Sequence, residues 1–246
     1  MTSVGFEDRL RRKTPRGRAV WSMSRSRPGW SIRLSFGAAA ISAASLMAAH
    51  LPLSPMTGHM TLHILLMNLL APLLAWIATL SSASPWGNLG STRALVVAAV
   101  FQIVLLWLAH APSVMAWSVA GGLPAAMLPV ALFVAALIFW GSVFAQHGAE
   151  RWRALVALLL TGKLFCLLAA LLVFAPRHLY PAMLAGAHTH AAAETASLLA
   201  DQQLAGLLMI AACPLTYVAA ATAIAARWLK EGGSADPAPA RPVDWA

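Results

Sequence analysis

The fold is decided by residues 152–176, which read WRALVALLLTGKLFCLLAALLVFAP. At about 1.5 Å per residue, a helix of this length spans roughly 37 Å, which is more than the ~30 Å hydrocarbon core of a bilayer. The apolar residues run continuously rather than alternating, and this excludes a strand of a membrane β-barrel. The segment therefore predicts a transmembrane helix.

Other apolar runs of similar length lie on both sides of this segment. The chain of 246 residues is 60% hydrophobic and only 10% charged, whereas a soluble domain carries roughly 25% charged residues. These features predict an all-α fold, a polytopic bundle of about six spans within residues 33–230. The predicted spans are 33–50, 56–80, 93–117, 123–147, 152–176 and 203–229.

The basic residues indicate how the bundle is oriented. Nine of the 17 Lys and Arg residues precede residue 34, and most of the others lie at the ends of spans. With the N-terminus inside, only Arg177 falls in an outer loop, so the positive-inside rule predicts that both termini are cytoplasmic. This placement of charge indicates a multi-pass protein of the bacterial inner membrane, in contact with lipid, and excludes a nucleic-acid-binding protein.

The regions between and beyond the spans follow from this topology. Residues 1–32 are basic and, like residues 231–246, are predicted to be a disordered cytoplasmic tail, while residues 177–202 form a periplasmic loop. A cleaved signal ending near residue 50 is the alternative for the first span. The tail is too long for a signal peptide, and Ala48-Ala49-His50 is a poor cleavage site.

Side chains that bind soft metals gather on one face of the second predicted span. On a helical wheel, five of them share an arc of about 100°, the width of one helix face. Thioether and imidazole together suit Cu(I) better than magnesium or calcium. The alternative is that the methionines fill gaps in the core and the histidines form interfacial hydrogen bonds. The five residues are Met56, His59, Met60, His63 and Met67.

Two other predicted spans add candidate residues, of which His110 and Met209 are expected at a depth similar to that of His63, and Cys213 nearer the midplane. His110 lies close to the outer end of the third span, beside Pro112, which is expected to open the helix. In the sixth span, Gln202, Met209 and Cys213 share one face. Asp201 is expected in the first turn of that span, where it could act as a cap.

Lys163 lies in the middle of the fifth predicted span. An ammonium group at that depth costs at least ~2.5–3.5 kcal/mol on insertion scales. The side chain is therefore expected to face a wet cavity, a backbone carbonyl, a bound anion or a partner subunit, or to be neutral. We treat it as a functional candidate without an assigned partner.

Three segments together resemble the polytopic CtaG family of cytochrome c oxidase assembly factors. They are His59-Met60-Thr-Leu-His63-Ile-Leu-Leu-Met67 running into Ala71-Pro72, Trp107-Leu-Ala-His110-Ala-Pro112, and Asp201-Gln202-Gln203-Leu-Ala-Gly206. The resemblance implies a role in maturing the copper-containing oxidase, with His59, His63, His110, Asp201 and Gln202 at family positions. The implied cargo is Cu(I), bound transiently, and the implied partners are oxidase subunits or copper chaperones.

The chain departs from the family pattern at one place. Where the family usually shows a second His-x-x-x-His pair before Phe139-Trp140, this sequence has Ala125 and Pro129. This loss favours an alternative function, that of a non-catalytic structural subunit of a respiratory complex. A further alternative is electron transfer through a b-type haem held between His63 and His110.

No enzyme is predicted. The sequence contains no P-loop, no GxSxG, no HExxH, no CxxC and no paired buried carboxylates. The leading hypothesis is a membrane factor that handles Cu(I) from the periplasmic side and passes it to an oxidase by ligand exchange.

Overall fold

The computed structural model describes residues 53–80, 86–181 and 191–233. The chain divides into two units, residues 1–35 and 36–246, and the description below concerns the second unit alone. The predicted basic tail and the predicted first span lie outside the described residues. Every regular element within the described ranges is helical, and this confirms the predicted all-α class.

Five of the described helical segments are long and apolar enough to cross a bilayer, which confirms a polytopic bundle. They are Pro55–Thr79, Thr92–Ala109, Ala125–Phe144, Gly148–Phe174 and Ser197–Glu231. In chain order the elements are α2 (Pro55–Ile64), the π-helical η2 (Leu65–Leu70), α3 (Ala71–Thr79), the 3₁₀ turn η3 (Gly87–Leu89), α4 (Thr92–Ala109), α5 (Pro112–Val119), α6 (Leu123–Phe144), the 3₁₀ turn η4 (Gly148–Glu150), α7 (Arg151–Phe174) and α8 (Ala191–Gly233).

Two helix boundaries differ from the sequence prediction. The predicted span 93–117 is two helices, because Ala111 precedes Pro112 and is extended, with φ −66° and ψ 136°; the proline ring disfavours a helical residue before it. The last helix begins at Ala191, inside the loop predicted for residues 177–202. Its first ten residues are mostly alanine and leucine, which favour helix, so the helix starts well before the polar Asp201.

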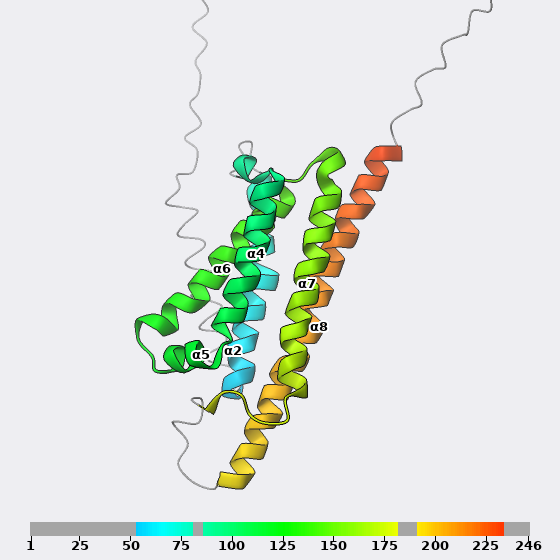
Figure 1. Ribbon diagram of the computed structural model, residues 1–246. Helices are drawn as coiled ribbons and strands as arrows, with labels where there is room; N and C mark the ends of the chain where they lie inside the picture. The colour runs from blue at the N-terminus through cyan, green and yellow to red at the C-terminus, as the bar shows by residue number, and fades with distance from the viewer. Residues whose placement is uncertain (1–52, 81–85, 182–190, 234–246) are drawn as a thin grey trace, which may run out of the picture. The chain divides into compact units, whose positions relative to one another are not determined.

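Helices α7 and α8 pack side by side along the bundle (Figure 1). Small residues make this approach possible, since Ala169 of α7 and Ala205 and Gly206 of α8 are all buried. A Cβ atom built on Gly206 would lie 2.9 Å from the carbonyl oxygen of Ala169. The backbones of α7 and α8 are therefore too close to accommodate a Cβ atom at position 206. Small residues commonly allow such close approach between helices in membranes.

A buried group of aromatic side chains from three helices, with a glutamine from a fourth, lies at the centre of the bundle. Tyr217 of α8 lies with its ring centroid 5.2 Å from that of Trp140, 6.1 Å from that of Phe139 and 5.5 Å from that of Phe165. Its hydroxyl accepts a hydrogen bond of 3.0 Å from the Gln102 amide of α4. Since α4, α6, α7 and α8 all contribute, this cluster fixes the helices that surround the functional residues.

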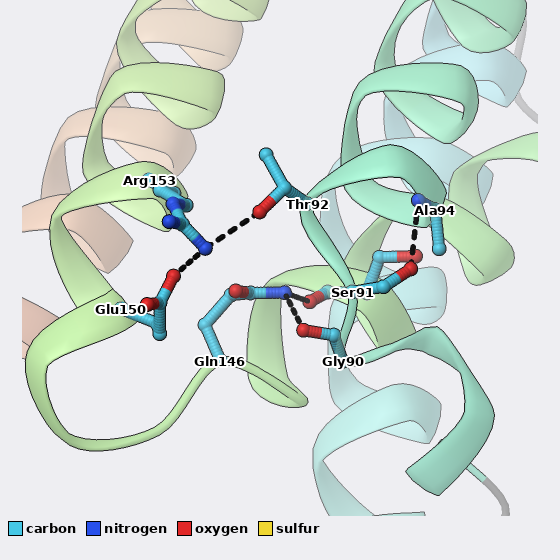
Figure 2. Close-up of polar contacts among 8 residues, drawn as sticks. Gly90, Ser91, Thr92, Ala94, Gln146, Glu150 and Arg153 are labelled. Carbon is cyan, nitrogen blue, oxygen red and sulfur yellow. Dashed lines mark hydrogen bonds and ion pairs between the residues drawn. The ribbon is translucent and has the colours of Figure 1, made fainter.

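Polar contacts bring three helix ends together at one end of the bundle (Figure 2). Arg153 near the start of α7 pairs with Glu150 and donates a hydrogen bond to the hydroxyl of Thr92, the first residue of α4. The side-chain amide of Gln146, just past α6, donates to the carbonyl of Gly90 at 3.2 Å. The start of α4, the end of α6 and the start of α7 therefore share one end.

The end of α8 belongs to the same group, because Arg151 pairs with Glu231 at 2.6 Å. Basic residues thus collect at this end of the bundle, whereas the start of α2 and the end of α4 lie at the other. The basic residues concerned are Arg93, Arg151, Arg153, Arg227 and Lys230.

A π-helical segment, η2, interrupts the first described span just before a proline. The carbonyl of Met67 lies five residues before Pro72, and proline has no N–H to complete the i to i+5 bond of a π-helix. The buried indole Nε1–H of Trp140 donates to this carbonyl instead, at 3.2 Å. A side chain from α6 therefore supplies the hydrogen bond that the proline removes.

We expect Trp140→Phe to lower the free energy of unfolding by about 1–3 kcal/mol, because it leaves the buried Met67 carbonyl without a donor. Reversible unfolding in mixed micelles measures this change. Trp117→Phe is the control, since Trp117 is 61% exposed and its replacement is expected to stay within about 0.5 kcal/mol. Equal effects of the two substitutions would contradict the assigned role of the indole.

Candidate metal centre

Three histidines come together at the end of the bundle opposite the basic residues. His59 and His63 lie one turn apart on α2, and His110 is the residue that ends α4. One ligand atom from each ring lies within 4.8 Å of the others, so the three could hold one metal ion. The Nε2 atoms of His59 and His63 are 2.9 Å apart. The structure therefore brings together the three histidines that sequence reasoning selected from two separate segments.

The backbone around His110 fixes the orientation of its ring. Nδ1 donates a hydrogen bond of 2.8 Å to the carbonyl of Leu106, which leaves the proton-free Nε2 directed elsewhere. Nε2 is buried and has no hydrogen-bond partner among the described residues. A ring that donates through one nitrogen to a carbonyl and keeps the other free is the usual arrangement of a metal-binding histidine.

His63 is also buried with a nitrogen unsatisfied, since its Nδ1 finds no partner in the described part of the chain. Its side chain is 4% exposed, whereas His59 is half-buried. Buried polar atoms are nearly always hydrogen-bonded in folded proteins, so unpaired ring nitrogens in one cluster indicate a ligand site.

A small cavity adjoins the histidine cluster, since His63 and His110 are among the residues that line it. Its volume is about 10 Å³, which is room for roughly one water-sized species. Methionine and cysteine residues from two membrane spans line the cavity together with two of the histidines. The lining residues are Met60, His63, Ile64, Met67, Asn68, Leu106, His110, Phe165, Met209 and Cys213.

Most of the predicted soft ligands line this cavity, but Met56 does not. Met60, Met67, Met209 and Cys213 all contribute to its wall. Met56 is buried one turn before Met60, and its backbone N–H is held by Asp201. Met56 is therefore part of the core around the first turn of α2 rather than of the cavity.

Asn68 belongs to the cavity and was missed by the sequence analysis. On an ideal α-helix it lies about 120° from Met56, outside the predicted face. The π-helical η2 changes the rotation per residue at this point and turns Asn68 inward. Its amide donates to the sulfur of Cys213 at 3.1 Å. A polar amide in the middle of an apolar run was the signal that could have found it.

Asp201 caps a helix other than its own. It lies inside α8, so the prediction that it occupies the first turn of its helix is wrong. Its carboxylate accepts hydrogen bonds from the N–H groups of Met56 at 2.8 Å and Thr57 at 3.0 Å, and from the Thr57 hydroxyl. An anion there is favoured by the dipole of α2, and the contact fixes the helix that carries His59 and His63.

Gln202 is a second positioning residue. Its side-chain oxygen accepts from the N–H of Leu179 at 2.8 Å, and its nitrogen donates to the carbonyl of Leu172 at 3.1 Å. The segment it holds includes Tyr180, whose hydroxyl donates to the carbonyl of His110 at 3.0 Å. Burial raises the pKa of Tyr180 to about 12, so the hydroxyl keeps its proton at neutral pH.

Lys163 takes no part in this site. Its side chain is exposed on the outer face of α7, while Phe165 of the same helix lines the cavity. Of the environments considered for the ammonium, an internal cavity of the described bundle is excluded by this placement.

The positions of the missing second histidine pair do not contribute to the cavity. Ala125 is exposed and Pro129 half-buried near the start of α6, and neither lines the cavity. The three-histidine cluster is therefore assembled without them.

These observations define an all-helical, multi-pass membrane protein with a buried histidine cluster at one end of its bundle. Among known families, the model of the cytochrome c oxidase caa3 assembly factors (Caa3_CtaG) matches residues 8–231. The chain belongs to this family, which confirms the resemblance found in its motifs, and it is thus a cytochrome c oxidase assembly factor. No curated protein and no solved structure gave a match.

Proposed function

We propose that this assembly factor receives Cu(I) at the histidine cluster and delivers it to cytochrome c oxidase without catalysing a reaction. The observation that carries the proposal is the convergence of three histidines, with one ligand atom from each within 4.8 Å of the others, beside a cavity lined by methionine and cysteine. The 2.9 Å between the nitrogens of His59 and His63 lets both reach one ion at the ~2.0–2.1 Å typical of metal–imidazole bonds.

The donor set supports Cu(I) over other metals. Imidazole binds zinc, copper, iron and nickel, whereas thioether and thiol ligands favour Cu(I). Below the histidines, Met67, Met209 and Cys213 offer soft sulfur donors from two helices. A cation held by three imidazoles can exchange onto these sulfurs one ligand at a time, so the ion is never without a ligand while it moves.

The charge distribution supports delivery from the periplasmic side. The end of the bundle that carries Arg93, Arg151, Arg153 and Arg227 is assigned to the cytoplasm by the positive-inside rule. The histidine cluster lies at the opposite end, which in this proposed topology is the periplasmic side of the inner membrane. This topology also puts the C-terminal end of α8 on the cytoplasmic side.

The b-haem alternative is disfavoured by the size of the site. The ring centroids of His63 and His110 are 5.5 Å apart and the cavity beside them measures about 10 Å³. A porphyrin clamped between two imidazoles needs far more space than one water-sized ligand.

The test is anaerobic Cu(I) titration of the detergent-purified chain against a chromogenic Cu(I) chelator. We expect one tightly held Cu(I) per chain and an affinity that falls roughly 100-fold or more in His63→Ala or His110→Ala, since losing even an outer partner of a metal site costs 10–100-fold. In cells that lack the native gene, the same variants are expected to lower the copper content of the oxidase.

Controls come from the chain itself. His147→Ala removes an exposed histidine at the opposite end of the bundle and is expected to bind copper like the wild type. Cys213→Ser removes a cysteine that lines the cavity. Its control is Cys166→Ser, because Cys166 does not line the cavity. A wild-type chain that binds no Cu(I) would overturn the proposal and leave the structural-subunit function ahead.

A further inference from the structure

Lys163 lies on the outward face of α7, in the middle of an apolar stripe. The residues one turn before and after it, Leu159, Leu160 and Leu167, are each about half exposed, at 49%, 56% and 56%. The opposite face of α7 is buried against the bundle through Thr161, Phe165 and other residues. The described residues provide no hydrogen bond or ion pair for the ammonium of Lys163.

The depth of Lys163 prevents its ammonium from reaching water along the helix. Counted along α7 at about 1.5 Å per residue, it lies roughly 15 Å from Arg153 and roughly 17 Å from the last helical residue, Phe174. The lysine side chain extends about 6 Å, so snorkelling leaves the charge well inside a core ~30 Å thick. If Lys163 keeps its charge at this depth, it requires an anionic or polar partner.

None of the predicted spans of this chain contains an Asp or Glu. Its eight acidic residues include none between Glu150 and Glu194 and none between Asp8 and Glu150. Asp201 is buried and bonded to α2, and Glu150 and Glu231 pair with arginines at the basic end. The predicted first span, residues 33–50, contains no Asp or Glu.

A second copy of the chain is no better as a partner. Its own spans lack an accessible carboxylate, and a symmetric contact through this face brings two lysines together. Like charges at close range in a low dielectric repel strongly. These points favour a different polypeptide as the partner of Lys163.

We propose that the outward face of α7 packs against a transmembrane helix of another membrane protein that carries an Asp or Glu near its middle, which pairs with Lys163. The apolar residues on either side of Lys163 supply packing, and the ion pair fixes the register and the choice of partner. This contact lies outside the histidine cluster and does not depend on copper. It gives an assembly factor a means of recognising a spanning subunit within the bilayer.

A hydrophobic carbodiimide tests the contact in native membranes that contain the full chain. The reagent adds to a protonated carboxyl to give an O-acylisourea. The neutral amine of Lys163 then attacks the acyl carbon, so an amide bond forms and a urea leaves. We expect mass spectrometry to find Lys163 joined to an Asp or Glu inside an apolar segment of another protein. Lys163→Arg, which keeps the charge, is expected to give no amide, and Lys230 serves as the exposed comparison.

Association is the second measurement. With the cross-linked partner identified, Lys163→Leu is expected to reduce its co-purification in detergent at least tenfold, while Lys163→Arg retains it. Cu(I) titration of Lys163→Leu is expected to match the wild type, so failure of this proposal is distinguished from failure of the copper proposal.

Three results would overturn the inference. One is an amide from Lys163 to a carboxyl of this chain or of a second copy. Another is undiminished co-purification of Lys163→Leu. The third is a disulfide between a cysteine at position 160 or 167 and one within residues 33–50, formed in a cysteine-free background, since it would show that the chain covers this face itself.

Discussion

Replacing Asp201 by alanine is expected to lower the free energy of unfolding by about 3–5 kcal/mol. Two backbone N–H groups and one hydroxyl of α2 donate to this carboxylate, and hydrogen bonds to a charged group are worth ~1.5–3 kcal/mol each. The N–H groups of Met56 and Thr57 lie in buried residues, so water cannot replace the acceptor without opening the helix end. Unfolding in mixed micelles measures the loss.

Asparagine at the same position separates charge from shape. Asp201→Asn keeps one acceptor oxygen, so it is expected to lose about half as much stability as Asp201→Ala. The neighbouring Gln203→Ala is a control, since its half-buried side chain is not part of the α2 cap. A change below about 1 kcal/mol for Asp201→Ala would refute the capping role.

The second large effect is expected at Gly206. Gly206→Leu should lower the free energy of unfolding by at least about 3 kcal/mol, because overpacking costs ~1–3 kcal/mol even where side chains can yield. Here an added Cβ lies 2.9 Å from the backbone oxygen of Ala169 and 2.7 Å from Cγ2 of Val173. The valine methyl can move, but the carbonyl belongs to α7, so the two helices must separate.

Gly58 provides the matched control for this substitution. Among the described residues, a Cβ at Gly58 meets only Cβ of Leu53, at the ordinary distance of 3.7 Å. Gly58→Ala is therefore expected to be neutral or to stabilise by up to ~1 kcal/mol through helix propensity, whereas Gly206→Ala destabilises. Similar effects at the two glycines would show that α7 and α8 are not in close contact at Gly206.

Hydrophobicity alone predicted most of the described fold. The apolar runs 123–147 and 152–176 correspond to α6, Leu123–Phe144, and α7, Arg151–Phe174, within a few residues. Burying every backbone polar group in lipid requires continuous helices, so run length is a direct signal of a span. Run length does not predict where the helices end. Pro112 divides one apolar run into two helices, and the alanine-rich residues before Asp201 extend another helix beyond its run.

The candidate site was predictable only in part. Helical spacing placed His59, Met60, His63 and Met67 on one face, since those residues are close in sequence. The role of Asp201 was not predictable from spacing, because Thr57 lies 144 residues away and only the tertiary fold joins them. The outward direction of Lys163 likewise depends on how α7 packs against its neighbours.

The early end of α4 has a consequence for the lipid around the protein. From Thr92 to Ala109 the helix has 18 residues and measures about 27 Å, less than the ~30 Å of an average hydrocarbon core. A span shorter than the bilayer is accommodated by local thinning. We expect the bilayer to be thinner beside the end of α4, near His110. Water then reaches the outer residues of the histidine cluster. Under the proposed function, a water-soluble copper donor would then meet the histidines without any ion having to enter hydrocarbon.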